Sequence, residues 1–176
     1  SHDPNWLRAG NWFTKNATAD LAIIGVGASA SALTPNRSHK SPAAIREALF
    51  RYSTFSSSLN LDITEHLNAA DFGDVSKPDS QEKTVTELTQ HYENARTFIL
   101  LGGDNSITYS GARALLNFVE PSKLGVITLD AHHDLRDGIS NGSPIKQLLD
   151  AGVPGKNVVQ IGINNFANSR FYSDRA

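Results

Sequence analysis

Residues 125–136 read GVITLDAHHDLR, an apolar β-rich run that ends abruptly in carboxylate and imidazole side chains. Three other runs are also apolar on both faces, namely Leu21–Val26, Thr97–Leu101 and Asn157–Ile163. Strands with this pattern are typical of parallel sheets that helices cover on two sides. The three runs, together with Gly125–Leu129, therefore predict buried parallel strands.

Helical patterns lie between these strands. Apolar residues at helical spacing predict helices over Pro42–Tyr52, Asp79–Ala95, Ile107–Phe118 and Pro144–Ala151, and Asp79 with Glu82 has the spacing of a capping box. Strands that alternate with helices in this way predict an α/β fold, with a mostly parallel sheet and helices on both faces.

The remaining sequence adds less to the fold. The stretch Ser53–Asp74 is ambiguous and predicts only one or two short strands. Residues 1–176 contain no repeat and no linker long enough to separate two domains, so we expect a single domain.

Composition excludes several classes of protein. No apolar run approaches the roughly 18–20 residues that cross a bilayer, and the N-terminus lacks a secretory pattern, so we expect a cytoplasmic protein without membrane contact. Sixteen basic against eighteen acidic residues argue against a nucleic-acid partner. The chain has no cysteine, so any metal must be bound by His and carboxylates.

Ligands of such folds bind at the carboxyl ends of the strands, where three loops are of interest. Gly25–Ala30 superficially fits a dinucleotide-binding pattern, but a polar loop containing Pro35 follows it, which favours a tight strand exit over a phosphate site. Gly102–Thr108 permits a sharp turn in which Asp104 accepts backbone hydrogen bonds, and by itself it indicates only a turn and a helix cap.

The third loop contains the candidate metal ligands. At alternate positions of an extended segment, Asp130, His132 and Asp134 project to one side, while Ala131 and His133 face away. Two carboxylates and one imidazole suit a hard or borderline divalent ion such as manganese. The alternative is that these are polar residues of a loop without a metal-binding role. However, burying two carboxylates without a cation between them would cost free energy.

The motifs together resemble those of the ureohydrolases, the family of arginase, agmatinase and formimidoylglutamase. GGDNS at 102–106 and DAHHD at 130–134 are similar to the family's GGDHS and DAHxD motifs, in the same order. SPAAIR at 41–46 resembles an early GPxxIR helix, and NGSP at 141–144 resembles an HGxP turn. This resemblance runs from about residue 20 to the end of the chain. It implies a three-layer α/β/α sandwich that hydrolyses C–N bonds of small guanidines or formimidamides, usually as a homo-oligomer.

The resemblance also implies a metal centre with two manganese ions. Asp130 would bridge the ions, with His132 on one and Asp134 on the other, and these three residues would form the catalytic centre. The family has another histidine ligand where this chain has Asn105. An amide oxygen is a weaker ligand than imidazole, so this metal position would be loose or empty, or Asn105 would ligate through water. The family's later D-x-D pair has no counterpart after GINNF at 162–166, which implies that the family's C-terminal part is lacking.

Other positions bear on the substrate. Arg136 occupies a position where formimidoylglutamases carry arginine, which would clamp a substrate carboxylate, although an ion pair with Asp134 or Asp137 is the alternative. Asn141, which cannot transfer a proton, stands where arginases and agmatinases have a proton-relaying histidine, and Ser143 of the same turn is expected to bind substrate.

These positions, and FANS at 166–169, favour formimidoylglutamase. We therefore expect metal-assisted hydrolysis of N-formimidoyl-L-glutamate to L-glutamate and formamide, a reaction of histidine degradation. An agmatinase or another guanidino-acid hydrolase, and a weakly metallated relative without catalytic activity, remain as alternatives.

Overall fold

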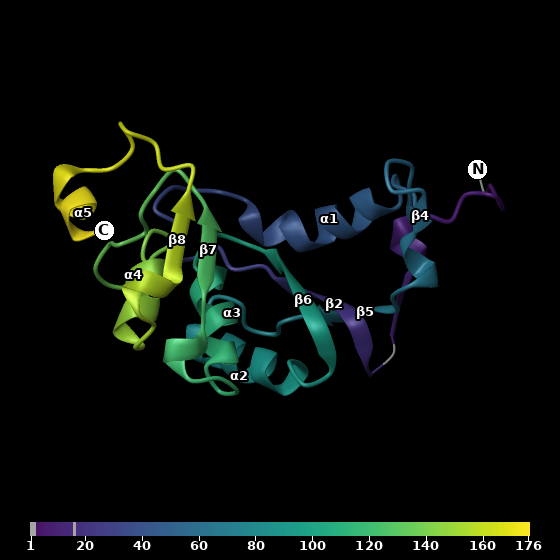
Figure 1. Ribbon diagram of the computed structural model, residues 1–176, viewed down its shortest axis with the longest axis horizontal. Helices are drawn as coiled ribbons and strands as arrows, with labels where there is room; N and C mark the ends of the chain where they lie inside the picture. The colour runs from purple at the N-terminus through teal and green to yellow at the C-terminus, as the bar shows by residue number, and fades with distance from the viewer. Residues whose placement is uncertain (1–2, 16) are drawn as a thin grey trace.

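The central sheet has four strands that pair in parallel, in the order β1-β5-β2-β6. A computed structural model describes residues 3–15 and 17–176. The strands are β1 (Phe13–Thr14), β2 (Ala19–Val26), β5 (Ala69–Asp74) and β6 (Ala95–Gly102). Figure 1 shows helix α1 (Ser41–Leu49) on one side of this sheet.

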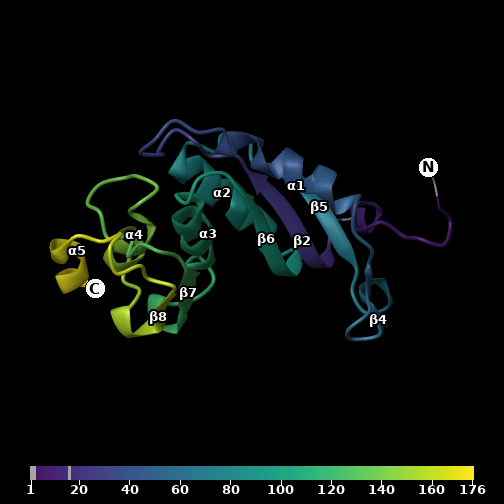
Figure 2. The same cartoon turned by 90° about the horizontal axis from the view of Figure 1, so that it is seen from above.

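Two helices, α2 (Gln81–His91) and α3 (Ile107–Leu115), cover the opposite side of the sheet (Figures 1 and 2). Their buried Leu88 and Ala114 pack in one core with Ile24 and Val26 of β2. Helices on both faces of a parallel sheet confirm the predicted α/β arrangement.

A second, two-stranded parallel sheet continues the fold. It contains β7 (Val126–Leu129) and β8 (Val158–Ile161), and α4 (Pro144–Asp150) packs against it. A second core joins Leu148 of α4 with residues of α3 and both strands. Helix α3 therefore contributes to both cores, and it connects the two sheets through packing.

The remaining elements are short. β3 (Phe55–Ser56) and β4 (Leu61–Asp62) form an antiparallel hairpin, and α5 (Arg170–Arg175) lies near the end of the chain. Single turns of 3₁₀ helix occupy Ala9–Asn11, Ser38–Lys40, Ile63–Glu65, Pro121–Lys123 and Gly155–Asn157. Within the described residues, no helix has the length and apolar character needed to span a membrane.

The structure corrects the prediction for residues 53–74. Besides the hairpin, this stretch contains β5, which lies between β1 and β2 and is thus an interior strand. Its sequence, AADFGD, lacks the β-branched residues that indicate strands, so local propensity gave no signal.

The helix boundaries also differ from the prediction. The capping box at Asp79 is wrong: α2 begins at Gln81, and the Asp79 carboxylate accepts hydrogen bonds from the backbone N–H groups of Ser29 and Ala30. Helix α1 ends at Leu49 instead of Tyr52.

One face of the second sheet is exposed and apolar, so the prediction that its two strands are buried on both faces is wrong. Ile127 and Leu129 of β7 are 72% and 83% exposed, and Val159 and Ile161 of β8 are each 50% exposed. Contiguous apolar surface of this kind promotes association. We therefore expect the 176-residue chain to self-associate at micromolar concentration, and the double variant Ile127→Lys, Leu129→Lys to do so less.

Light scattering across a dilution series measures this effect. Leu59→Lys is the control, because Leu59 is 73% exposed on the β3–β4 hairpin, away from this sheet. Equal association of the double variant and the wild type would contradict the prediction.

Candidate metal centre

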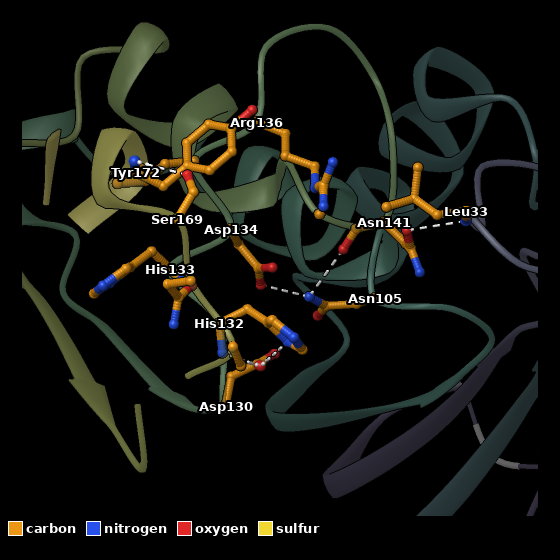
Figure 3. A pocket seen from close by; sticks show the side chains of 14 residues that line it. Leu33, Asn105, Asp130, His132, His133, Asp134, Arg136, Asn141, Ser169 and Tyr172 are labelled. Atoms are coloured by element: carbon orange, nitrogen blue, oxygen red, sulfur yellow. Dashed lines mark hydrogen bonds and ion pairs between the residues drawn. The ribbon is translucent and has the colours of Figure 1, made fainter. Parts of the chain in front are cut away.

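A cavity of about 260 Å³ lies where the loops after β6 and β7 meet. It is lined by Asn105 from the first loop and by Asp130, His132 and Asp134 from the second, and Figure 3 shows these side chains around it. The structure thus brings the four expected metal-binding residues to one cavity.

Asp130 and His132 form a close pair at one side of this cavity. The backbone N–H of His132 donates to Oδ1 of Asp130 at 2.8 Å, and Nδ1 of the same histidine lies 3.2 Å from that oxygen. The expected extended alternation is not what places them, since β7 ends at Leu129 and the motif follows it as a loop.

Asp134 is the most constrained residue of the motif. It is only 8% exposed, and its backbone has a positive φ of 54°, a conformation that asparagine and aspartate tolerate best after glycine. Burial, with the nearby charge of Asp130, raises the pKa of the Asp134 carboxyl to about 6. Strain and a perturbed carboxylate in a cavity are features of functional sites.

The chemistry of these donors fits a divalent cation. In the part of the chain that is described, neither Asp130 nor Asp134 has a Lys or Arg ion-pair partner, and His132 and Arg136 offset the raised pKa of Asp134 only in part, so a cation would relieve the repulsion between the two carboxylates. The geometry is not preformed, because no group of three or more His, Cys, Asp or Glu within residues 3–15 and 17–176 is arranged to hold a metal ion.

Asn105 is oriented by three hydrogen bonds. Its Nδ2 donates to Oδ2 of Asp134 at 2.6 Å and to the backbone oxygen of Asn141 at 3.2 Å, while its Oδ1 accepts from the Thr108 hydroxyl at 2.8 Å. Direct ligation through Oδ1 would therefore require the amide to turn over and release Thr108.

The structure places the three expected substrate-binding residues differently. Arg136 and Asn141 line the cavity, but Ser143 is fully buried and its hydroxyl is hydrogen-bonded to that of Ser140 at 2.7 Å. Ser143 precedes α4 and supports the turn instead of lining the cavity.

Arg136 is available to a ligand. Among the described residues, Arg136 forms neither of the alternative ion pairs, with Asp134 or with Asp137, and the Asp137 carboxylate instead accepts a hydrogen bond from Arg175 at 2.9 Å. Gly142 leaves room for the Arg136 side chain, since a Cβ at this glycine would lie 2.9 Å from Arg136 Cδ.

The cavity is also lined by residues that the sequence did not predict. Leu33 and Tyr172 come from segments far apart in the sequence, and no local motif marks either one. His133, which the sequence predicts to face away from the metal ligands and to pack or line the pocket, does line the cavity, and its Nδ1 lies 2.9 Å from Oε1 of Gln160.

The loop after β2 is not open to a phosphate at Ser29 and Ala30. The Asp79 carboxylate already accepts from both backbone N–H groups, at 2.7 and 2.8 Å. This intramolecular use of the donors agrees with the interpretation of the loop as a strand exit.

Gly103, in the loop after β6, allows that loop to approach the loop after β2 closely. A Cβ at Gly103 would lie 2.4 Å from the backbone oxygen of Val26 and 2.6 Å from the backbone nitrogen of Ala28. Because the backbone cannot move away cheaply, we expect Gly103→Ala to lower the free energy of unfolding by about 2–4 kcal/mol.

Urea unfolding followed by circular dichroism measures this loss. Gly125→Ala is the matched control, because a Cβ there meets nothing nearer than 3.9 Å. Equal midpoints for the two variants would show that the close approach at Gly103 does not matter.

Comparisons with known proteins agree with this fold and site. A model of the arginase family matches residues 19–176. The chain is 35% identical over 165 residues to a formimidoylglutamase of Halalkalibacterium halodurans, in a match that covers 86% of this chain and 50% of that protein. The chain thus spans about half the length of the curated relatives it matches.

Solved structures give the same result. The formimidoylglutamase of Bacillus subtilis has a TM-score of 0.88 at 27% identity, over 99% of this chain and 58% of that one. Trypanosoma cruzi formiminoglutamase with manganese has a TM-score of 0.86 at 26% identity, over 97% and 62% of the two chains. With a family match over most of its length and the expected motifs gathered at one cavity, this chain belongs to the arginase family.

Proposed function

We propose that this chain carries the metal-binding and substrate-binding residues of a manganese-dependent hydrolase that cleaves N-formimidoyl-L-glutamate to L-glutamate and formamide. The observation that carries the proposal is the single cavity in which two carboxylates and an imidazole lie with Arg136. Relatives named formimidoylglutamase support the substrate, and the manganese of the Trypanosoma cruzi formiminoglutamase structure supports the metal.

The residues that would hold manganese are Asp130, His132 and Asp134, with Asn105 at a weaker position. When bound, manganese supplies Lewis acidity, which lowers the pKa of water enough for attack on a planar amidine carbon near neutral pH. The carboxylates of Asp130 and Asp134 also attract the positive charge of an amidinium group to the same side of the cavity.

The other end of the substrate would be bound by Arg136. A guanidinium group donates two parallel hydrogen bonds to a carboxylate, and the glutamate part of the substrate offers two carboxylates. The backbone N–H of Arg136 donates to the Gly142 oxygen at 3.1 Å, which fixes the start of the side chain. An amidinium at the carboxylates and a carboxylate at Arg136 together would set the direction of the bound substrate.

One alternative has an observation in its favour. The amide nitrogen of Asn105 faces Asp134, and this orientation favours a weakly metallated relative without catalytic activity. We expect a second metal ion to bind less tightly than the first for this reason.

Metal content and product release test the proposal together. We would incubate the chain with manganese, desalt it, measure manganese per chain by elemental analysis, and assay formamide from N-formimidoyl-L-glutamate and urea from L-arginine and agmatine. Formamide release supports the proposal, and faster urea release would favour a guanidino-acid hydrolase. No bound metal and no product would favour the weakly metallated relative.

A further inference from the structure

Residues 29–33, here called the wall segment, contribute Leu33 to the lining of the cavity and are held by carboxylates of two other segments. Asp79, which precedes α2, accepts from the backbone N–H groups of Ser29 and Ala30. Asp104, which follows β6, accepts from the Ser31 hydroxyl at 3.1 Å. The wall segment is therefore built into the site before any ligand binds, which lowers the entropic cost of using it for binding.

Asn141 provides the third attachment of the wall segment. Its backbone N–H donates to the Ser31 oxygen at 3.1 Å, and its side-chain Oδ1 accepts from the backbone N–H of Leu33 at 3.3 Å. The backbone oxygen of Asn141 also accepts from Asn105. One residue thus links the wall segment to the expected metal side of the cavity, and its own amide oxygen is used for this link.

Leu33 is the large apolar side chain of the wall segment. It is 57% exposed although it lines the cavity, so a ligand can cover it. Figure 3 shows Leu33 and Tyr172 on opposite sides of the cavity, with the Arg136 side chain extending toward Asn141 between them. The cavity therefore offers carboxylates for a cation, a guanidinium for an anion, and an apolar side chain.

We propose that Leu33, held by Asn141, is a specificity-determining residue that packs on the two methylene groups of the substrate, which lie between the carbon that carries the amidine nitrogen and the distal carboxylate. The inference rests on the proposed function and extends it to a segment that no motif marks. It assigns Asn141 a positioning role through Leu33 instead of direct contact with the substrate. Substrates whose amidine and carboxylate are joined by an apolar chain should therefore gain most from Leu33.

The first experiment measures kcat and KM for N-formimidoyl-L-glutamate with the manganese-loaded chain, and affinity by calorimetry with the manganese-free chain. We expect Leu33→Ala to raise KM about fivefold to tenfold and to weaken binding equally, because the apolar contact is lost. We expect kcat to change less than about twofold, since Leu33 touches no reacting atom. Leu33→Met, which keeps an apolar side chain, should raise KM less than Leu33→Ala does. Leu59→Ala, at an exposed leucine on the hairpin, serves as the control.

The second experiment tests the role of Asn141. We expect Asn141→Ala to remove the hydrogen-exchange protection of the Leu33 amide and to raise KM as Leu33→Ala does. The inference would be overturned, with the proposed function left in place, if the Leu33 amide stayed protected in Asn141→Ala. Wild-type KM and affinity in both Leu33→Ala and Asn141→Ala would overturn it as well. A wild-type chain that neither binds nor hydrolyses the substrate would overturn both.

Discussion

Replacing Asp134 with asparagine is expected to abolish manganese-dependent stabilisation of this chain. Saturating manganese should stabilise the wild type by about 2.7 kcal/mol at a hundredfold excess over Kd, because a ligand that binds only the folded state shifts the unfolding equilibrium. A neutral amide replaces the carboxylate in Asp134→Asn, so we expect manganese affinity to fall by about a hundredfold or more.

The same substitution should stabilise the metal-free chain. The pKa of Asp134 is raised to about 6 in the folded state, so ionising this carboxyl costs the fold roughly 2–3 kcal/mol at neutral pH. Asparagine removes this cost, tolerates the positive φ, and still accepts the hydrogen bond from Asn105 through its Oδ1.

The sign of the pH dependence follows from this pKa. Between the unfolded pKa of about 4 and the folded value of about 6, the folded state binds more protons, so the stability of the metal-free wild type falls as pH rises through this window. We expect Asp134→Asn to lack this fall. Comparing the two proteins cancels the opposite contribution of Asp71, whose pKa is lowered by its hydrogen bonds to Arg46 and Gly73 against a raising effect of burial.

Urea unfolding at several pH values, and thermal melts with and without manganese, measure these effects. Asp137→Asn is the matched control, because that carboxylate is 70% exposed, three residues away, and paired with Arg175. A manganese-dependent shift in Asp134→Asn equal to that of the wild type would show that Asp134 is not a ligand.

Local sequence could predict strands only where their residues carry a strand signal. Leu21–Val26 is rich in branched apolar residues and lies inside β2 as expected. β5 consists of alanine, aspartate, glycine and one phenylalanine, and it is stabilised by pairing on both sides and by the ion pair of Asp71 with Arg46 of α1. Those interactions join distant segments, so no window of sequence contains them.

The same reasoning separates the predictable and unpredictable parts of the site. Asp130, His132 and Asp134 lie within five residues after a strand, so their presence at one cavity could be predicted from the sequence, although the extended alternation expected to place them is wrong. Asp79 has the spacing of a helix cap, yet it binds the loop after β2, because a carboxylate accepts from whichever backbone N–H groups the fold brings to it. Leu33 and Tyr172 reach the cavity only through tertiary packing.

Replacing Asn105 with histidine is expected to raise the manganese content of this chain. The amide of Asn105 presents its nitrogen to Asp134 and its oxygen to Thr108, and neither arrangement offers a lone pair toward the carboxylates. An imidazole offers a stronger nitrogen ligand beside Asp134, so we expect the weaker manganese position to bind at least about tenfold more tightly.

Equilibrium dialysis over a range of manganese concentrations, followed by elemental analysis, measures this gain as ions per chain. Asn94→His is the control, because it adds an imidazole at the opposite end of β6, where the strand begins. Unchanged content in Asn105→His would mean that the weaker position lacks further ligands, so that no single donor at residue 105 can complete it. A higher manganese content in Asn105→His would instead show that asparagine at this position weakens the metal site, because every other donor of the site is the same in the two proteins.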